Sequence, residues 1–350
     1  MLAGMALLIA GIDEAGYGPL LGPLCVGCCT LRLDGWTPEA PAPDFWSILS
    51  GAVARSTKDK QRLAVADSKQ LKLASGGKRH PLLHLERGVL AFALAAMTEP
   101  ELPATDLDLF GRTGAADADW FDSEPYRGPA LALPVAGDAG LLSIAATMLR
   151  GEMHRAGCTA VGVACRVIPE WEFNAVVREQ GGKADTTLVG IGEHLRAFCT
   201  RALSEPEGTH ARVVCDRLGG RASYADLLAA LLEPLTPALG AADVRTIAEG
   251  EVWSKYELRF GSRPELAIGV LFAVECERKH LPVAVASMTA KLHRELAMER
   301  FNDSFRRRAQ AQGRGPVAPT AGYWQDAQRW LRDAEELLRP GERERLVRIA

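Results

Sequence analysis

Short apolar runs alternate along the chain with longer segments in which apolar residues recur at helical spacing. Gly, Pro and Asp bound the apolar runs, and their length favours buried strands over helices. Strands are predicted over residues 6–12, 24–33, 159–168, 211–215, 244–248, 251–260 and 266–277. Helices are predicted over residues 82–97, 140–156, 186–203, 224–233, 283–301 and 325–338. This mixture predicts an α/β layer architecture with a functional site at one edge of the sheet.

One segment departs from this pattern. Residues 98–134 are rich in Pro, Asp and Gly and show no sustained periodicity, which indicates an insertion rather than a separate domain. The chain has 350 residues, of which 47% are hydrophobic, enough for an ordinary globular core. We therefore predict a core built from residues 1–97 and 151–300, an insertion over 98–150, and a C-terminal helical extension over 301–350.

The overall charge does not indicate a nucleic-acid partner. With 41 basic and 44 acidic residues the net charge is −3, so any such partner must be held by a local basic face or through metal ions. The run Arg306-Arg307-Arg308, extended by Arg314, is the candidate for that face. The alternative is a solvated helix surface, since charge runs commonly form one. His280 and His293 lie near the proposed site and are expected to be exposed and structural.

The cysteines and the N-terminus bear on the compartment. Most of the eight cysteines lie within apolar runs, as free buried thiols do. Cys25 and Cys28 form a C-x-x-C, but no second pair and no histidine pair follows at zinc-site spacing. The apolar segment 1–12 lacks the basic start of a signal peptide, and no uncharged run reaches the ~18 residues of a membrane span. We expect a cytoplasmic protein without membrane contact, and by default a monomer.

Acidic residues recur where apolar runs end. Asp13 and Glu14 end the first run, Asp216 follows Val-Val-Cys, and Glu277 ends a later run. Acids that converge at a sheet edge repel one another and imply bound cations. Oxygen ligands favour Mg²⁺ or Mn²⁺, and two such ions ~4 Å apart can clamp a phosphodiester. Two alternatives stay open: a solvated turn at Asp13-Glu14, and Glu275 in place of Glu277, because i and i+2 share a strand face.

Four motifs follow one another along the chain: GIDEAGYGPLLGP at 11–23, DSKQL at 67–71, ASMTAK at 286–291, and Gly322-Tyr323. In this order they resemble the motifs of type 2 ribonucleases H, the HII and HIII group. The resemblance covers residues 6–95, 159–300 and 320–332. It implies a ribonuclease H-like fold, with a central mixed β-sheet flanked by helices. It also implies a metal site of four acids, which fall on Asp13, Glu14, Asp216 and Glu277.

The resemblance further implies how substrate is bound. The backbone of Gly16-Tyr17-Gly18 would contact the ribose 2′-hydroxyl, which distinguishes RNA from DNA. Tyr17 stands where the family has a basic residue; either it stacks on or hydrogen-bonds to the sugar, or the substrate preference has shifted. Tyr323 would pack on the sugar at an RNA–DNA junction, with a core tyrosine as the alternative. Ser68 would bind substrate or cap a helix. The other implied substrate-binding residues are Lys69, Ser287 and Lys291.

The sequence thus predicts a hydrolase that uses two divalent ions, Mg²⁺ or Mn²⁺. The predicted endoribonuclease would cut the RNA strand of RNA/DNA hybrids, or DNA duplexes 5′ to an embedded ribonucleotide. Water would attack phosphorus in line. The alternative is a non-catalytic or substrate-shifted nucleic-acid-binding protein of the same fold.

Overall fold

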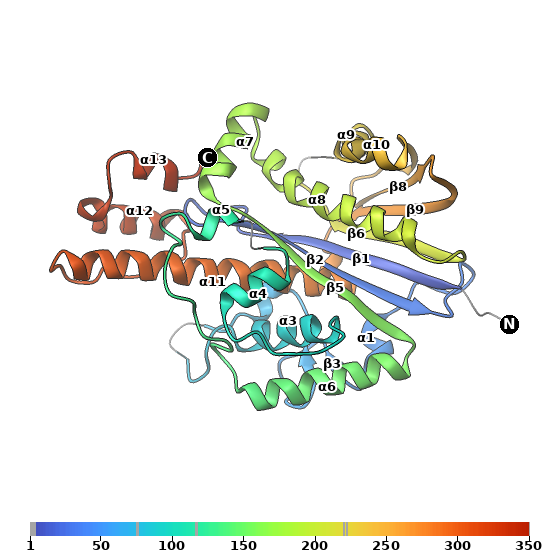
Figure 1. Cartoon of the computed structure of the whole chain (residues 1–350), viewed down its shortest axis with the longest axis horizontal. Helices are drawn as coiled ribbons and strands as arrows, with labels where there is room; N and C mark the ends of the chain where they lie inside the picture. The colour runs from blue at the N-terminus through green and yellow to red at the C-terminus, as the bar shows by residue number, and fades with distance from the viewer. Residues whose placement is uncertain (1–4, 75–76, 116–117, 220, 222, 350) are drawn as a thin grey trace.

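A mixed β-sheet forms the centre of the molecule (Figure 1). The computed structural model describes residues 5–74, 77–115, 118–219, 221 and 223–349. In these ranges the main sheet has seven strands in the order β5-β2-β1-β6-β9-β8-β7. Neighbouring strands are parallel for β1/β6 and β6/β9 and antiparallel for the other pairs. The strands are β1 (Ala6–Ala15), β2 (Leu24–Asp34), β5 (Cys158–Ile168), β6 (Thr209–Asp216), β7 (Ala242–Ala248), β8 (Trp253–Phe260) and β9 (Arg263–Ala273).

Helices cover both faces of the sheet (Figure 1). One face carries α11 (Leu281–Ala311), α3 (Leu83–Ala95) and α6 (Ala139–Arg155), and the other carries α8 (Lys183–Ser204) and α9 (Ala225–Leu232). The shorter helices are α1 (Phe45–Ile48), α2 (Ser68–Leu71), α4 (Asp106–Arg112), α5 (Ala118–Phe121), α7 (Glu170–Gln180), α10 (Thr236–Leu239), α12 (Trp324–Asp333) and α13 (Glu342–Leu346). The small elements are the parallel pair β3 (Val53–Ala54) and β4 (Leu63–Ala64), and the 3-10 turns η1 (Glu233–Leu235), η2 (Cys276–Arg278) and η3 (Glu335–Leu337).

The predicted fold class, an α/β fold with a central mixed sheet flanked by helices, is confirmed by this topology. Each predicted strand and helix overlaps an observed one. Two details differ. The apolar run at 266–277 was expected to be a strand up to its acidic end, but β9 stops at Ala273 and a 3-10 turn follows. Helix α7 was not predicted, because its sequence EWEFNAVVREQ mixes polar and apolar residues without a clear stripe.

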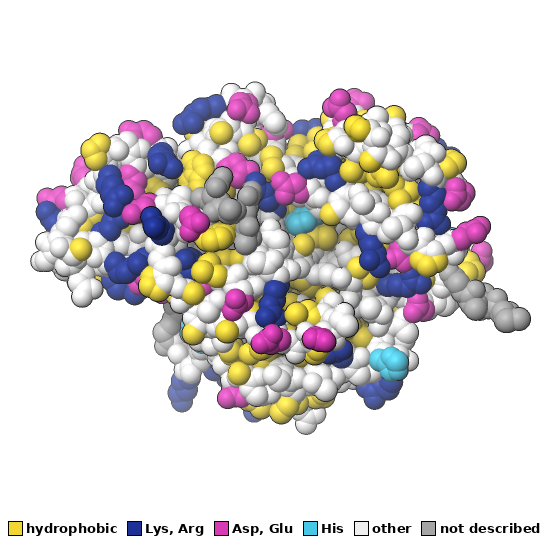
Figure 2. All heavy atoms as spheres, in the orientation of Figure 1, with side chains coloured by type: hydrophobic (Ala, Val, Ile, Leu, Met, Phe, Trp, Pro, Cys, Tyr) yellow, Lys and Arg dark blue, Asp and Glu magenta, His cyan; other side chains and the backbone are white. Residues whose placement is uncertain are grey.

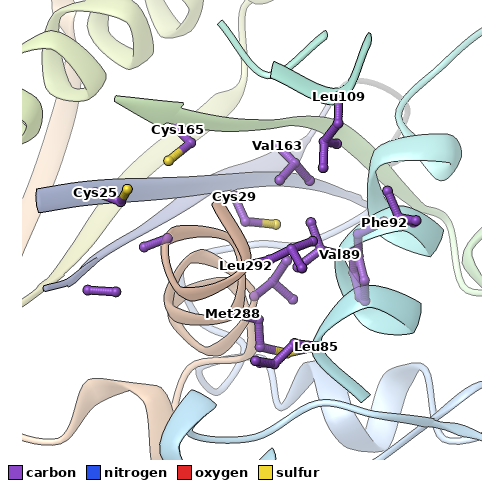
Figure 3. Close-up of a cluster of buried hydrophobic side chains, with 14 of the residues drawn as sticks. Cys25, Cys29, Leu85, Val89, Phe92, Leu109, Val163, Cys165, Met288 and Leu292 are labelled. Atoms are coloured by element: carbon purple, nitrogen blue, oxygen red, sulfur yellow. The ribbon is translucent and has the colours of Figure 1, made fainter. Parts of the chain in front are cut away.

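The larger core lies between the sheet and helices α11 and α3. Figure 3 shows Cys29 of β2 beside Leu292 of α11, with Phe92 of α3 on the other side of Leu292, while Cys25 lies near Cys165 of β5. Helix α11 packs directly on the strands: a Cβ added at Gly27 of β2 would lie 2.1 Å from the Ala286 carbonyl oxygen. Only glycine allows this approach, which brings the first turns of α11 to the edge where β1 ends.

The segment 98–150 contributes to this core. Leu109, Phe110, Trp120 and Tyr126 are buried in the same cluster as the sheet residues. The predicted boundaries of the insertion stay a prediction, but its aromatic side chains pack as part of the main body. The boundary predicted at residue 301 falls inside α11, which continues to Ala311. Within the described part of the chain, no helix is both long and apolar enough to cross a bilayer.

The expectation that His293 is exposed is wrong. Its ring is fully buried between α11 and α4. Its Nδ1 lies 2.8 Å from the Thr289 carbonyl oxygen and its Nε2 lies 2.7 Å from the Thr113 hydroxyl. Because a carbonyl only accepts, Nδ1 carries the proton and Nε2 accepts from Thr113. Burial lowers the pKa of His293 from 6.5 to about 4, so this histidine is a neutral core residue.

This lowered pKa predicts acid sensitivity. The unfolded chain binds a proton at His293 that the folded protein does not, so the free energy of unfolding falls as pH drops from about 6.5 towards 4. Between pH 7 and pH 5 the parent should lose about 2 kcal/mol more than His293→Gln, measured by urea unfolding. The control is His154→Gln, at an exposed position on α6. Equal losses in the parent and His293→Gln would contradict the prediction.

Candidate active site

A cavity of about 280 Å³ opens at the edge of the sheet where β1 and β6 end. Six separate segments of the chain form its wall. Every residue that the sequence analysis proposed for the site lies in this wall, although its role there stays a prediction. The lining residues are Asp13, Glu14, Ala15, Gly16, Tyr17, Gly18, Pro19, Asp67, Ser68, Lys69, Asp216, Glu277, Ser287, Lys291 and Tyr323.

Strand pairing brings the first acids together. β1 and β6 run parallel with Ile12 opposite Cys215, so Asp13 and Asp216 follow at the same edge of the sheet. Burial raises the pKa of Asp13 well above its usual value, and the charges of Glu14 and Asp216 raise it further. Burial and Asp216 raise the pKa of Glu14 to about 7. Burial also raises the pKa of Asp216. The three carboxyls therefore disfavour one another's charge.

Glu277 completes the group of acids, and Glu275 does not join it. Glu275 has a left-handed backbone (φ 54°) and its exposed carboxylate pairs with Arg278 at 2.8 Å. Glu277 follows in the 3-10 turn and lines the cavity. Burial raises the pKa of Glu277, as do the charges of Asp216 and Asp67. The argument from alternate positions on a strand does not apply, because both residues lie beyond the end of β9.

Asp67 is an acid that sequence reasoning missed, although it heads the DSKQL motif. Its side chain caps α2 by accepting from the Lys69 backbone N–H at 2.9 Å, and it lines the cavity. Asp67 is therefore the helix cap that was considered for Ser68. The buried Ser68 hydroxyl instead accepts a hydrogen bond from Ser287 at 3.0 Å. This bond joins the second motif to the third, on α11.

The cavity carries an excess of negative charge. Its lining holds Asp13, Glu14, Asp67, Asp216 and Glu277, opposed by two lysines. Lys69 lowers the pKa of both Glu14 and Asp216. The ammonium of Lys291 is already paired with Glu295, which lies 2.9 Å away and also holds Lys72 at 2.7 Å.

This donor set fits a hard divalent cation. All the acids offer carboxylate oxygens, the ligands that Mg²⁺ and Mn²⁺ prefer. A bound cation would offset the burial, and for Asp13, Glu14 and Glu277 also the repulsion, that raise their pKa values. Among the residues that the structure describes, no three His, Cys, Asp or Glu side chains already form a finished coordination group. The carboxylates that would hold an ion are those of Asp13, Glu14, Asp216 and Glu277, which line the same cavity.

Aromatic side chains flank the acids. Tyr17 and Tyr323 line the cavity with 41% and 50% of their surface exposed, so Tyr323 is not the buried core residue considered as the alternative. Its position is set by Gly322, whose carbonyl accepts from the Leu20 and Leu21 N–H groups at 2.7 and 3.2 Å. The late Gly-Tyr motif is thereby docked on the loop that follows β1. Trp324 is exposed beside it.

The arginine run does not provide a free basic face. Arg306 and Arg307 pair with Asp303 on the same helix at 2.7 and 3.0 Å. Arg308 pairs with Glu124 and Glu342, and Arg314 pairs with Glu336. Figure 2 shows Lys and Arg interspersed with Asp and Glu over the visible face. The hypothesis that this run forms the nucleic-acid surface is not supported, because its charges are neutralised within the chain.

Comparison with known proteins gives distant similarities. No protein-family model matches the chain, and no curated protein matches it. The PCNA:RNase HII complex from Archaeoglobus fulgidus is similar at 15% identity, over 98% of this chain and 94% of that chain, with a TM-score of 0.38. Bst-RNase HIII in complex with Mn²⁺ is similar at 13% identity, over 100% and 68% of the two chains, with a TM-score of 0.36.

Ribonuclease H2 from Pyrococcus horikoshii OT3 is similar at 12% identity, over 94% and 99% of the two chains, with a TM-score of 0.29. All three are type 2 ribonucleases H, the group that the four sequence motifs resemble. At these TM-scores and identities the likenesses assign no role to any residue of this chain.

Proposed function

We propose that this chain is a metal-dependent endonuclease of the ribonuclease H type. It would hydrolyse the RNA strand of RNA/DNA hybrids, or cut duplex DNA 5′ to an embedded ribonucleotide. The observation that supports this proposal is the convergence of Asp13, Glu14, Asp216 and Glu277. They come from three distant parts of the sequence into one cavity, where their pKa values are raised.

Each group of residues that lines the cavity would have a distinct role. The four acids would hold Mg²⁺ or Mn²⁺, which when bound activates water and stabilises the leaving oxygen at phosphorus. Lys69 would face the substrate phosphate, because its charge is already directed toward Glu14 and Asp216. The joined hydroxyls of Ser68 and Ser287 offer a polar contact beside Asp13. Tyr323 and Tyr17 would contact sugars or bases at the rim.

A non-catalytic nucleic-acid-binding role is less well supported. Binding to phosphates is favoured by positive charge, and converging carboxylates oppose it. A nuclease with a shifted substrate is the second candidate, because the exposed Tyr17 stands where the resemblance implies a basic residue. All eight cysteines are free and buried, in agreement with the reducing cytoplasm proposed from the sequence.

The test is a cleavage assay on three substrates: an RNA/DNA hybrid, a DNA duplex with one ribonucleotide, and the same duplex without it. Each is incubated with Mg²⁺, with Mn²⁺ and with EDTA. We expect divalent-ion-dependent cleavage of at least one ribonucleotide-containing substrate, leaving 3′-hydroxyl and 5′-phosphate ends. Cleavage of the all-DNA duplex at an equal rate would favour the shifted-substrate alternative. No cleavage of any substrate with either ion would refute the proposal.

A further inference from the structure

The loop between β1 and β2 accepts hydrogen bonds from Arg348, a residue near the other end of the sequence. Arg348, in the segment after α13, is 2% exposed. Its guanidinium donates to the carbonyls of Gly16 at 2.5 Å, Tyr17 at 3.0 Å and Gly22 at 3.4 Å. Its backbone N–H donates to the Leu20 carbonyl at 2.9 Å. One residue therefore binds the loop at both of its ends and in its middle.

These bonds fix the direction of two peptide groups in the cavity wall. In a trans peptide the C=O and the following N–H point in opposite directions. The carbonyls of Gly16 and Tyr17 face the buried Arg348, so the N–H groups of Tyr17 and Gly18 face away from it, on the side of the cavity that both residues line. Neither N–H donates to another described residue. Two adjacent donors are thus available to an oxygen atom of a ligand.

Arg348 is itself held in place by contacts with α7. The Arg348 guanidinium lies over the Phe173 ring at 3.8 Å. The buried Asn174 side chain donates to the Val347 carbonyl at 2.9 Å and accepts from the Ile349 N–H at 2.8 Å. Residues of α7 therefore contact the Arg348 side chain and the backbone of both of its neighbours in the sequence. The same helix supplies Glu170, which accepts from the Gly22 N–H at 2.9 Å.

A second buried guanidinium lies under the same loop. Arg294 of α11 donates to the carbonyls of Leu21 at 3.3 Å and Ala321 at 2.9 Å. A Cβ at Gly16, whose φ is +96°, would lie 2.6 Å from the Arg294 side chain. Glycine is required here both by the backbone conformation and by the close approach of Arg294. Two buried guanidinium groups, those of Arg294 and Arg348, thus donate hydrogen bonds to this loop on the side away from the acids.

We propose that Arg348 is a positioning residue for the backbone contact to substrate that the family resemblance implies at Gly16-Tyr17-Gly18: it orients the Tyr17 and Gly18 amides to bind a substrate oxygen next to the acids. The oxygen belongs to a phosphate or to a sugar hydroxyl. The inference rests on the proposed function for the identity of the ligand as a nucleic acid. The geometry of the loop and its support does not depend on turnover. Arg348 acts through the loop and does not itself contact the ligand.

The test uses the full chain in an Asp216→Asn background, so that affinity is measured without cleavage. The probe is a DNA duplex with one ribonucleotide, in Mg²⁺, compared with the all-deoxy duplex. Arg348→Ala should weaken binding about ten-fold, because two donors lose their orientation. Arg348→Lys keeps a cation and should recover part of the affinity. Asn174→Ala removes the hydrogen bonds to the backbone on either side of Arg348 but keeps the arginine. It should also weaken binding.

The matched control is Arg343→Ala, an exposed arginine of α13 that should leave affinity unchanged. Hydrogen exchange provides a second readout that needs no substrate: the Leu20, Leu21 and Gly22 amides should exchange faster in Arg348→Ala and Asn174→Ala. A loss confined to the ribonucleotide duplex identifies a sugar hydroxyl as the bound oxygen, and an equal loss on both identifies a phosphate.

The possible failures are separable. A parent that binds the duplex but never cleaves it would defeat the proposed function and leave the positioning role standing. Three results would overturn the positioning role. The first is unchanged hydrogen exchange of the loop amides in both variants, and the second is unchanged duplex affinity despite faster exchange. The third is a parent protein that binds neither duplex. If Arg348→Ala does not fold, Arg348→Lys and Asn174→Ala decide the question by the same measurements.

Discussion

Asp13→Asn is expected to reduce cleavage by at least about a thousand-fold, which corresponds to about 4 kcal/mol of lost transition-state stabilisation. Asp13 lies at the centre of the acid group, where burial and the charges of Glu14 and Asp216 raise its pKa. The amide has nearly the same shape but cannot supply a charged oxygen to an ion. The measurement is kcat on the ribonucleotide duplex at saturating Mg²⁺ or Mn²⁺.

The contrast between Glu277 and Glu275 is the control for this experiment. Glu277→Gln should also impair cleavage, because Glu277 lines the cavity. Glu275→Gln removes an acid only two positions away that is exposed and paired with Arg278, and its rate should stay within about two-fold of the parent. Cleavage by Asp13→Asn at the parental rate would show that the acid cavity is not the catalytic centre.

Loss of activity in Asp13→Asn should be accompanied by a gain in stability of the metal-free protein. The folded-state pKa of Asp13 is raised above its unfolded value, so its charge opposes folding at pH values above the usual carboxyl range. Removing that charge removes the penalty and should raise the Tm in EDTA. Divalent ions should raise the Tm of the parent more than that of the variant, since ligands that bind only the folded state stabilise it.

Much of the fold could be predicted because its signals are local. Continuous apolar runs mark strands that are buried on both faces, and the acid after each of two runs marks the edge of the sheet. The pairing of Asp13 with Asp216 is not local: it depends on the parallel alignment of β1 with β6, some 200 residues apart. The recurrence of acids at the ends of apolar runs, together with the family resemblance, indicated it. Glu277 lines the cavity from a 3-10 turn and not from the end of the predicted strand, because β9 stops before it; its role as a metal ligand stays a prediction.

What could not be predicted depends on partners from other parts of the chain. Arg308 looks like part of a solvated basic run, yet it binds Glu124 and Glu342. His293 lies in a polar stretch of sequence, and its burial follows from the packing of α4 on α11. Arg348 has no sequence signal at all. Its hydrogen bonds form where the last described segment crosses the loop after β1.

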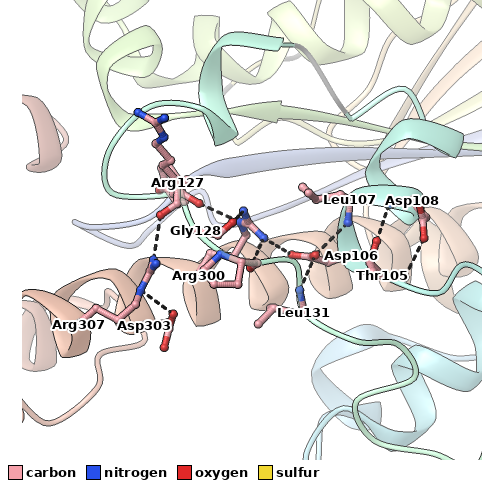
Figure 4. A network of polar contacts seen from close by, with 12 residues as sticks. Thr105, Asp106, Leu107, Asp108, Arg127, Gly128, Leu131, Arg300, Asp303 and Arg307 are labelled. Carbon is pink, nitrogen blue, oxygen red and sulfur yellow. Dashed lines mark hydrogen bonds and ion pairs between the residues drawn. The ribbon is translucent and has the colours of Figure 1, made fainter.

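The insertion offers the clearest case of such a long-range partner. Arg300 of α11 and Asp106 of α4 form a buried ion pair at 2.9 Å, with both side chains almost wholly enclosed. Figure 4 shows Arg300 also donating to the Gly128 carbonyl, and further bonds reach the carbonyls of Tyr126 and Pro129. Asp106 in turn accepts from the Leu107 and Leu131 N–H groups. Arg300, which lies outside the segment, thus makes a buried ion pair and several hydrogen bonds to a segment that has no periodicity of its own.

Arg300→Met should therefore lower the free energy of unfolding by about 3–5 kcal/mol, since it leaves a buried carboxylate and several carbonyls without their partner. That is a large part of the total stability of an ordinary domain. Urea unfolding measures the loss. Arg306→Met on the same helix is the matched control; among the described residues its half-exposed side chain pairs only with Glu299 and Asp303 of α11, and its loss should cost less than about 1 kcal/mol. Adding Asp106→Leu to Arg300→Met should restore part of the loss, because the uncompensated charge is then gone. If Arg300→Met is no more destabilising than Arg306→Met, the buried Arg300–Asp106 pair does not stabilise the segment 98–134.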